Sequence, residues 1–240
     1  MTDYQKRNPM LKSLKTVVLA TIVILGLSTG TKAQQMGVSF SYFVPKNGYF
    51  STPISPFSIR GIGVDLNRYV AIETGGSLYR MTGLNVKDLP FESRDPLLGP
   101  MFSAMVPLEL VLQFIGQDVE FRVKGGLFGF WNFSTKINYG NFDRAIREYE
   151  GWTVANSDLR FKNNPGWGYQ FGAEAVIYMN QQFGITLGAN YYIGDAKLDM
   201  EGTYTGGTDG NLETKTADFS NAKVDFTGFE LVLGAVFSTR

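Results

Sequence analysis

The sequence of 240 residues contains no cysteine and no histidine. Without cysteine the chain can form no disulfide, no thiolate metal site and no lipid-modified cysteine behind a leader. Without histidine it cannot build a Ser–His–acid hydrolase, and it has no imidazole to act as a general base or a metal ligand. Its glycine-rich stretches lack the spacing of a phosphate-binding loop. We therefore expect no enzymatic activity, no cofactor and no metal site.

Long apolar runs are also missing, except near the amino terminus. There four basic residues at positions 6, 7, 12 and 15 precede the apolar run 16–27, and small residues follow. A run of this length suits the core of a signal peptide, whereas a membrane-spanning helix needs about 20 apolar residues. We predict that residues 1–33 are a signal peptide cleaved after Ala33, and that residues 34–240 form one domain. The alternative is a short N-terminal anchor.

The charge balance shows no excess of basic residues in the exported part. Residues 1–33 carry five lysines and arginines and one aspartate, so the part after Ala33 has a net charge of about −4 in a chain that sums to zero. Nucleic-acid-binding domains usually present a basic stripe, so we expect no nucleic-acid partner. The 28 glycines, 19 phenylalanines and 12 tyrosines favour an all-β protein with aromatic belts.

Alternation with period two is the dominant pattern of this domain. In 119–133 the odd positions are apolar or glycine, and the even positions begin with Glu120, Arg122 and Lys124. A strand places such charges on one face, whereas a helix would spread them around its circumference. The same pattern predicts eight strands, at 37–44, 57–66, 69–81, 101–114, 118–134, 168–178, 183–194 and 223–238.

The connections between these strands alternate between short and long. Three are short turns, and those at about 45–56, 82–100, 135–167 and 195–222 are long. Transmembrane barrels combine short periplasmic turns with long extracellular loops. We therefore predict an all-β fold: an eight-stranded antiparallel up-and-down transmembrane β-barrel, apolar outside and polar inside, after a signal peptide. The alternative is a soluble, lipocalin-like barrel with the faces inverted.

The inward face carries charges that need partners, because an unpaired buried charge is very costly. Counting residues from the short turns puts Glu109, Arg122, Lys124 and Glu174 at a similar height, with Glu73 close by. We predict a structural ionic plug in which Arg122 and Lys124 hold Glu109 and Glu174. Its expected members are Glu73, Glu109, Glu120, Arg122, Lys124, Glu174 and Glu230. A conducting or proton-coupled path and a catalytic carboxylate pair are the alternatives.

The long loops are the remaining place for function. Loop 135–167 is rich in aromatic residues, which either pack within the loop or contact a partner outside the cell. The candidate contact residues are Tyr139, Phe142, Tyr149, Trp152 and Phe161. Residues 195–222 are expected to form a hairpin that extends two strands above the membrane.

The end segment Gly228-Phe-Glu-Leu-Val-Leu-Gly-Ala-Val-Phe237, with the strand pattern of about 36–238, resembles the small outer-membrane β-barrel family of the outer membrane protein A and X type. The resemblance implies location in the cell outer membrane of a Gram-negative envelope, with membrane lipid as partner and folding through the barrel-assembly machinery. We expect a monomeric, non-enzymatic protein that supports envelope integrity or surface interaction, with an unknown surface partner. The alternatives are a narrow porin and an accessory barrel of a transport or secretion complex.

Overall fold

The computed structural model describes residues 35–48 and 58–238, so the predicted signal peptide lies outside the described residues. Their elements are β1 Gln35–Pro45, β2 Ser58–Asn67, β3 Val70–Met81, β4 Val86–Lys87, β5 Met101–Ile115, β6 Val119–Phe133, α2 Tyr139–Glu150, β7 Val154–Asn163, β8 Gly166–Tyr178, β9 Phe183–Thr208, β10 Asn211–Phe219, β11 Lys223–Asp225 and β12 Gly228–Ser238.

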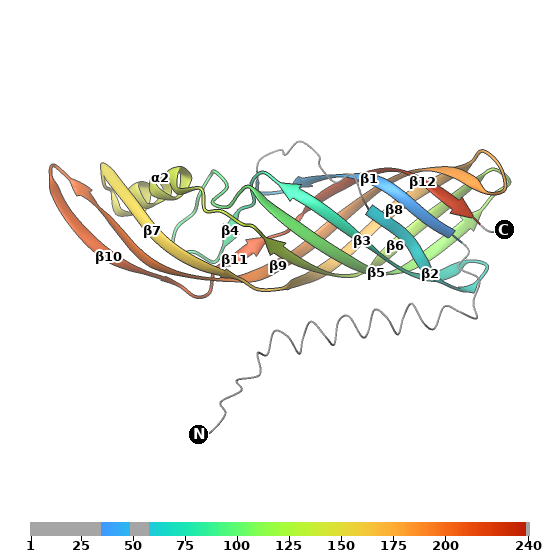
Figure 1. Ribbon diagram of the computed structural model, residues 1–240, viewed down its shortest axis with the longest axis horizontal. Helices are drawn as coiled ribbons and strands as arrows, with labels where there is room; N and C mark the ends of the chain where they lie inside the picture. The colour runs from blue at the N-terminus through green and yellow to red at the C-terminus, as the bar shows by residue number, and fades with distance from the viewer. Residues whose placement is uncertain (1–34, 49–57, 239–240) are drawn as a thin grey trace, which may run out of the picture.

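Eight of these strands close into a barrel (Figure 1). The order around the ring is β12, β1, β2, β3, β5, β6, β8 and β9, and β9 pairs again with β12. Every pairing in the ring is antiparallel. The predicted eight-stranded antiparallel barrel is therefore confirmed. Closure gives backbone groups partners within the protein, which is the condition for a sheet to cross a membrane.

The outer wall of the barrel is apolar. Along β5 exposed and buried residues alternate, so that Leu108 and Leu110 are 55% and 50% exposed whereas Glu109 between them is 4% exposed. The outward positions of β8, β9 and β12 follow the same alternation. An apolar band of this extent is typical of a surface covered by lipid. This arrangement is the reverse of a lipocalin-like barrel, so the alternative fold is wrong.

A folded cap continues the barrel at the end opposite the short turns. We use "cap" for β4, α2, β7, β10, β11 and the part of β9 beyond Asp195. The predicted strand 183–194 runs on to Thr208, where β9 pairs with β7 on one edge and β10 on the other. The predicted hairpin within 195–222 is thus present, and its two strands project well beyond the ring in Figure 1.

Helix α2 and strand β7 replace most of what the sequence indicated as loop 135–167. The side chain of Asn138 caps its first turn, and Gly151, in the left-handed conformation with φ 70°, ends it. Phe142, Ala145 and Ile146 are spaced three and four residues apart, so they face one side and are buried against the cap. Among the residues that the structure describes, no helix is long and apolar enough to cross a membrane.

The predicted last strand 223–238 is interrupted. β11 ends at Asp225, β12 begins at Gly228, and Phe226 between them is fully buried. The break turns this aromatic ring towards the barrel interior, where it stacks on Phe43 with a centroid distance of 4.8 Å and on Phe130 at 4.5 Å. The prediction of one continuous strand is therefore wrong at this point.

Candidate functional site

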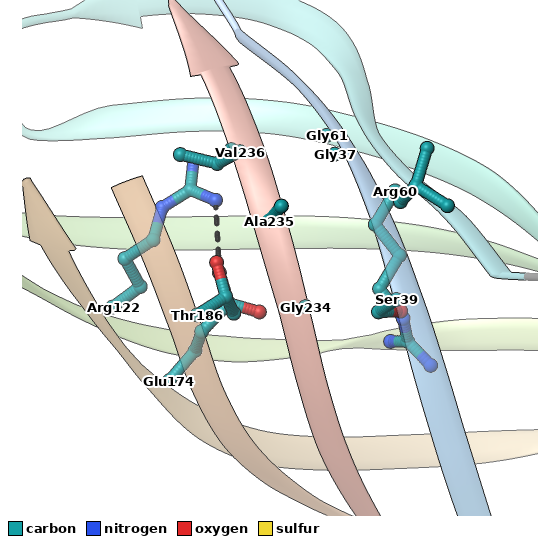
Figure 2. Close-up of a pocket in the computed structure, with 11 residues that line it drawn as sticks. Gly37, Ser39, Arg60, Gly61, Arg122, Glu174, Thr186, Gly234, Ala235 and Val236 are labelled. Atoms are coloured by element: carbon teal, nitrogen blue, oxygen red, sulfur yellow. Dashed lines mark hydrogen bonds and ion pairs between the residues drawn. The ribbon is translucent and has the colours of Figure 1, made fainter. Parts of the chain in front are cut away.

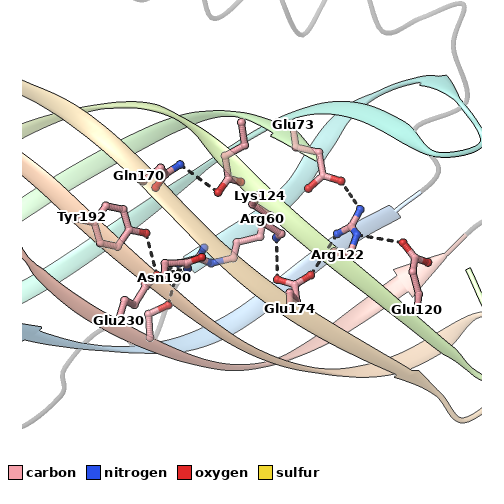
Figure 3. A network of polar contacts seen from close by, with 12 residues as sticks. Arg60, Glu73, Glu120, Arg122, Lys124, Gln170, Glu174, Asn190, Tyr192 and Glu230 are labelled. Atoms are coloured by element: carbon pink, nitrogen blue, oxygen red, sulfur yellow. Dashed lines mark hydrogen bonds and ion pairs between the residues drawn. The ribbon is translucent and has the colours of Figure 1, made fainter. Parts of the chain in front are cut away.

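The described part of the lumen is filled by two layers of side chains. The ionic layer consists of Arg60, Glu73, Glu109, Glu120, Arg122, Lys124, Glu174 and Glu230, all less than 8% exposed. Figure 3 shows how side chains from several strands of the ring converge in this layer. The aromatic layer, nearer the cap, consists of Phe43, Tyr79, Phe128, Phe130, Tyr192 and Phe226.

Arg122 organises the part of the ionic layer nearest the short turns. Its guanidinium forms an ion pair with Glu73 from β3, and its Nη1 lies 3.2 Å from the carboxylate of Glu174 on β8. Its Nε lies 3.1 Å from Glu120, two residues away on β6. The Tyr178 hydroxyl donates a hydrogen bond of 2.7 Å to Glu120. One cation therefore holds three carboxylates and joins β3, β6 and β8 across the lumen.

Lys124 adds a second cation on the same face of β6. Its Nζ lies 2.7 Å from Glu174 Oε2, so that carboxylate is shared between Arg122 and Lys124, as predicted. Glu109 behaves differently. Among the described residues it forms no ion pair, and its Oε1 accepts a hydrogen bond of 3.1 Å from Gln170. The prediction that Arg122 and Lys124 hold Glu109 is therefore wrong, because residues at a similar height in the barrel need not be in contact.

Glu230 is the centre of the second half of the ionic layer. This carboxylate is fully buried and pairs with Arg60 on β2 at 2.6 Å. It also accepts hydrogen bonds from Asn190 Nδ2 at 2.6 Å, from the Tyr192 hydroxyl at 2.8 Å and from the Tyr79 hydroxyl. Both oxygens are thus satisfied by a cation and neutral donors, as a buried carboxylate requires. Glu230 is one of the predicted members of the plug, whereas its partner Arg60 is not among them.

Little space remains between the two halves. A hollow of about 10 Å³ lies between Arg60 and the Arg122–Glu174 pair, lined also by Ser39, Thr186 and Gly234 (Figure 2). That is about the space of one water molecule. The layer combines five carboxylates with three cations, and neutral donors such as Gln170 and Asn190 complete it. The geometry is that of a cross-link between strands.

The aromatic layer closes the lumen on the cap side. Phe128 is 2% exposed, and its ring meets Tyr192 edge-on with a centroid distance of 5.0 Å. Phe226 inserts among these rings from the break before β12. Tyr192 and Tyr79 belong to both layers, because their rings pack here while their hydroxyls bind Glu230. The expected polar interior is therefore interrupted by this aromatic layer on the cap side of the ionic layer.

The aromatic residues predicted as extracellular contacts divide into three groups. Tyr139 and Tyr149 are 41% and 52% exposed, so they remain available to a partner. Trp152 and Phe161 are partly buried against the cap core. Phe142 is fully buried and packs edge-on against Phe91. The prediction of Phe142 as a surface contact is wrong, because the amphipathic helix turns it inwards.

Polar contacts hold α2 to the cap sheet. Glu150, the last residue of α2, pairs with Lys215 on β10 at 2.6 Å and accepts a hydrogen bond of 2.8 Å from the Tyr204 hydroxyl. The hydrogen bonds from Lys215 and Tyr204 lower the pKa of Glu150, and the bond to Glu150 raises the pKa of Lys215. Burial and the neighbouring carboxylate raise the pKa of Tyr204 to about 12. These contacts fasten the helix to the sheet.

Among residues 35–48 and 58–238, no three acidic side chains are grouped so that they could hold a metal ion. A closed antiparallel barrel of eight strands with an apolar outer wall and a packed lumen is the fold of the small outer-membrane β-barrel proteins. Comparison with solved structures agrees. The outer membrane protein OprG from Pseudomonas aeruginosa matches with a TM-score of 0.51 at 11% identity, over 86% of this chain and 96% of that one.

Two further barrels match with lower scores. Ail, the attachment invasion locus protein of Yersinia pestis, has a TM-score of 0.39 at 12% identity, over 85% of this chain and 94% of that one. A major outer membrane protein of Thermus thermophilus has a TM-score of 0.44 at 13% identity, over 85% and 98%. No family model matches the sequence, and no curated protein does. Identities this low bear on the fold alone.

Proposed function

We propose that this chain is a non-enzymatic protein of the outer membrane that presents its cap at the cell surface as an interaction module, on a barrel that does not conduct. The observation that carries the proposal is the contrast between the lumen of the barrel and the cap. Buried charges and rings fill the lumen, whereas the cap displays a broad and ordered exposed face. In this proposal the lumen layers are structural and the cap meets the partner.

The exposed face of the cap sheet is largely polar. β7, β9 and β10 place their outward residues in register, which gives the rows Asn156–Thr205–Thr214 and Asp158–Thr203–Thr216. The opposite face is covered by the cap core, which includes Leu159, Tyr204 and Ala217. Small hydroxyl groups on a rigid sheet form hydrogen bonds at little cost in side-chain entropy. The face therefore suits a polar partner, such as a glycan or a hydrophilic protein surface.

The test separates surface interaction from a role in the membrane itself. A deletion strain would be complemented with wild type, with the face variant Thr203→Lys plus Thr216→Lys, or with the control Glu148→Lys, which makes the same change in charge at an exposed position of α2. We expect the face variant to lose cell–cell or cell–surface attachment while resistance to detergent is kept. The control should retain both properties.

Two results would count against the proposal. One is unchanged attachment of cells that carry the face variant, when this variant is present in the outer membrane in the same amount as wild type. The other is a steady ion current through the purified wild type, which would favour the narrow porin instead. The packed lumen supports the non-conducting reading, since side chains of an eight-stranded barrel suffice to fill its interior.

A further inference from the structure

The ionic layer contains more carboxylates than cations. Its five buried glutamates face three cations, Arg60, Arg122 and Lys124. Arg60 pairs with Glu230 at 2.6 Å, and Lys124 pairs with Glu174 at 2.7 Å. Arg122 is divided among three carboxylates. Negative charge that is buried in excess of positive charge is very costly, so the layer requires a further positive charge, of which a proton is the smallest.

Glu109 is the member of the layer that lacks a cation. It is buried, it forms no ion pair among the described residues, and its Oε1 accepts a hydrogen bond of 3.1 Å from Gln170 Nε2. Charged groups also act on it from β2, β6 and β8, namely Arg60, Lys124 and Glu174. Both of these cations are engaged by other carboxylates. The excess negative charge is therefore concentrated at Glu109.

Glu73 lies directly opposite Glu109 in the sheet, and both side chains are buried in the lumen. The Cβ atoms of opposing residues lie about 4.5–5.5 Å apart, and like charges at such positions are destabilising. One oxygen of Glu73 binds Arg122 (Figure 3). The other, Oε2, is buried and has no hydrogen-bond partner among the described residues. This oxygen can only accept a hydrogen bond, so it lacks a donor.

The neighbours of this carboxyl pair supply no such donor. The row across the barrel wall consists of Gly63, Glu73, Glu109, Gly126, Gln170 and Tyr192. The two glycines that flank the pair have no side-chain donor and no charge. The Tyr192 hydroxyl donates to Glu230, and the Gln170 amide donates to Glu109. A proton on the pair itself is the remaining donor.

We propose that Glu109 is a neutral carboxylic acid at neutral pH and donates a hydrogen bond from its Oε2 to Oε2 of Glu73. The two side chains then form a buried proton-binding site between β3 and β5. Gln170 already donates to Oε1 of Glu109, which leaves the other oxygen for the proton, and Arg122 holds Glu73 as the acceptor. Two carboxyl groups in one site commonly share a proton, because like charges in contact cannot both persist. The inference concerns the barrel and is independent of the proposed role of the cap.

The proton should appear in the pH dependence of stability. The chain has no histidine and no cysteine. Apart from the terminal amine, no group of ordinary behaviour therefore titrates between about pH 6 and pH 8. An unfolded glutamate loses its proton near about pH 4.3, so above this pH the folded state holds one proton more than the unfolded state. The equilibrium constant for folding should then fall about tenfold for each unit by which the pH rises.

The experiment measures urea unfolding at about pH 6, 7 and 8 after refolding into neutral phospholipid vesicles. The test variant is Glu109→Gln, whose amide can donate to Glu73 and accept from Gln170 as the neutral acid does. The control is Glu92→Gln, an exposed carboxylate between β4 and β5. Infrared spectra of the folded proteins at neutral pH then report the carbonyl stretch of a neutral carboxylic acid, which is separate from the carboxylate bands.

We expect wild type and the control to lose about tenfold in the folding constant per pH unit and to show the acid band. Glu109→Gln should fold, should lack the band and should be equally stable at all three pH values. A wild type that is equally stable from pH 6 to pH 8, or that lacks the band, would overturn the proposal. So would a band that persists in Glu109→Gln, failure of this variant to fold, or wild-type stability that depends on sodium concentration in place of pH.

Discussion

Arg122 offers the most direct test of the ionic layer. The substitution Arg122→Met keeps much of the side-chain volume and removes the cation that contacts Glu73, Glu120 and Glu174. Glu174 retains Lys124, whereas Glu73 then has no ion pair among the described residues. Removing one partner from a buried ionic group typically costs about 3–5 kcal/mol, because the other charges stay buried and uncompensated.

The assay is urea unfolding of the barrel refolded into phospholipid vesicles, followed by tryptophan fluorescence. For an unfolding slope of about 1–3 kcal/mol per molar urea, the loss should lower the midpoint by at least about 1 M. A double-mutant cycle sharpens the test. Glu73→Gln removes the charge that Arg122→Met leaves behind, so the double variant should recover about 1–3 kcal/mol relative to the sum of the single losses.

Lys136→Met is the control, since Lys136 is exposed and forms no ion pair among the described residues. It should change the free energy of unfolding by less than about 0.5 kcal/mol. The ionic layer does not stabilise the barrel as described if Arg122→Met unfolds at the same urea concentration as wild type, or if the stability losses of Arg122→Met and Glu73→Gln simply add.

Three further predictions concern the wall, the cap and the closed ring. Leu187→Arg, on the lipid face, should lower the free energy of unfolding by about 2–4 kcal/mol. Leu212→Arg, on the exposed cap hairpin, should lower it by less than about 0.5 kcal/mol. Equal urea midpoints of the two variants would refute the assignment of Leu187 to the lipid face. Tyr204 should ionise near pH 12, seen in the absorbance difference at about 295 nm between wild type and Tyr204→Phe. Because its folded pKa lies above the ordinary value of about 10, its contribution to stability is present below pH 10 and is lost as the pH rises towards 12; a step centred at pH 10 would contradict the buried contact with Glu150. The closed barrel should migrate differently on gels before and after boiling, and identical mobility would count against closure.

The strands could be predicted because alternation is a local property of the sequence. In β5 and β6 every second residue is apolar, and the turn between them is short, so pairing and register follow directly. The same alternation puts Phe128 and Phe130 on the inner face together with Arg122. The charged end of β6 indicates a polar interior, but the inward residues Phe128 and Phe130 further along the same strand are aromatic.

The contacts of the ionic layer depend on geometry that alternation does not specify. Gly61 has φ 73° and lies where the β2–β3 register shifts, so counting residues along β2 gives the wrong face beyond it. Arg60, just before this irregularity, was missed for that reason. Glu109 lies opposite Gly126, which in turn lies opposite Gln170. Only the three-dimensional arrangement shows that the partner of Glu109 is the side-chain amide of Gln170 and not a cation.

The fold of the cap depends on contacts between distant parts of the chain, which local sequence patterns do not show. Asn138, Gly151 and the spacing of Phe142, Ala145 and Ile146 are local signals for α2 that were available in the sequence. The partners of the cap are not local: β7 pairs with the far half of β9, and β4 pairs with β11. Phe226 enters the lumen because the last strand breaks before Gly228, and the alternation on either side does not reveal that break.

Charges and rings fill the described lumen, and a filled lumen should not conduct ions. Single-channel recording of the purified wild type in a planar bilayer tests it most directly, with Arg122→Ala plus Lys124→Ala measured beside it. We expect no steady ion current through wild type, and brief or sustained openings in the double variant, whose ionic layer has lost two of its three cations. A steady current through wild type would contradict it.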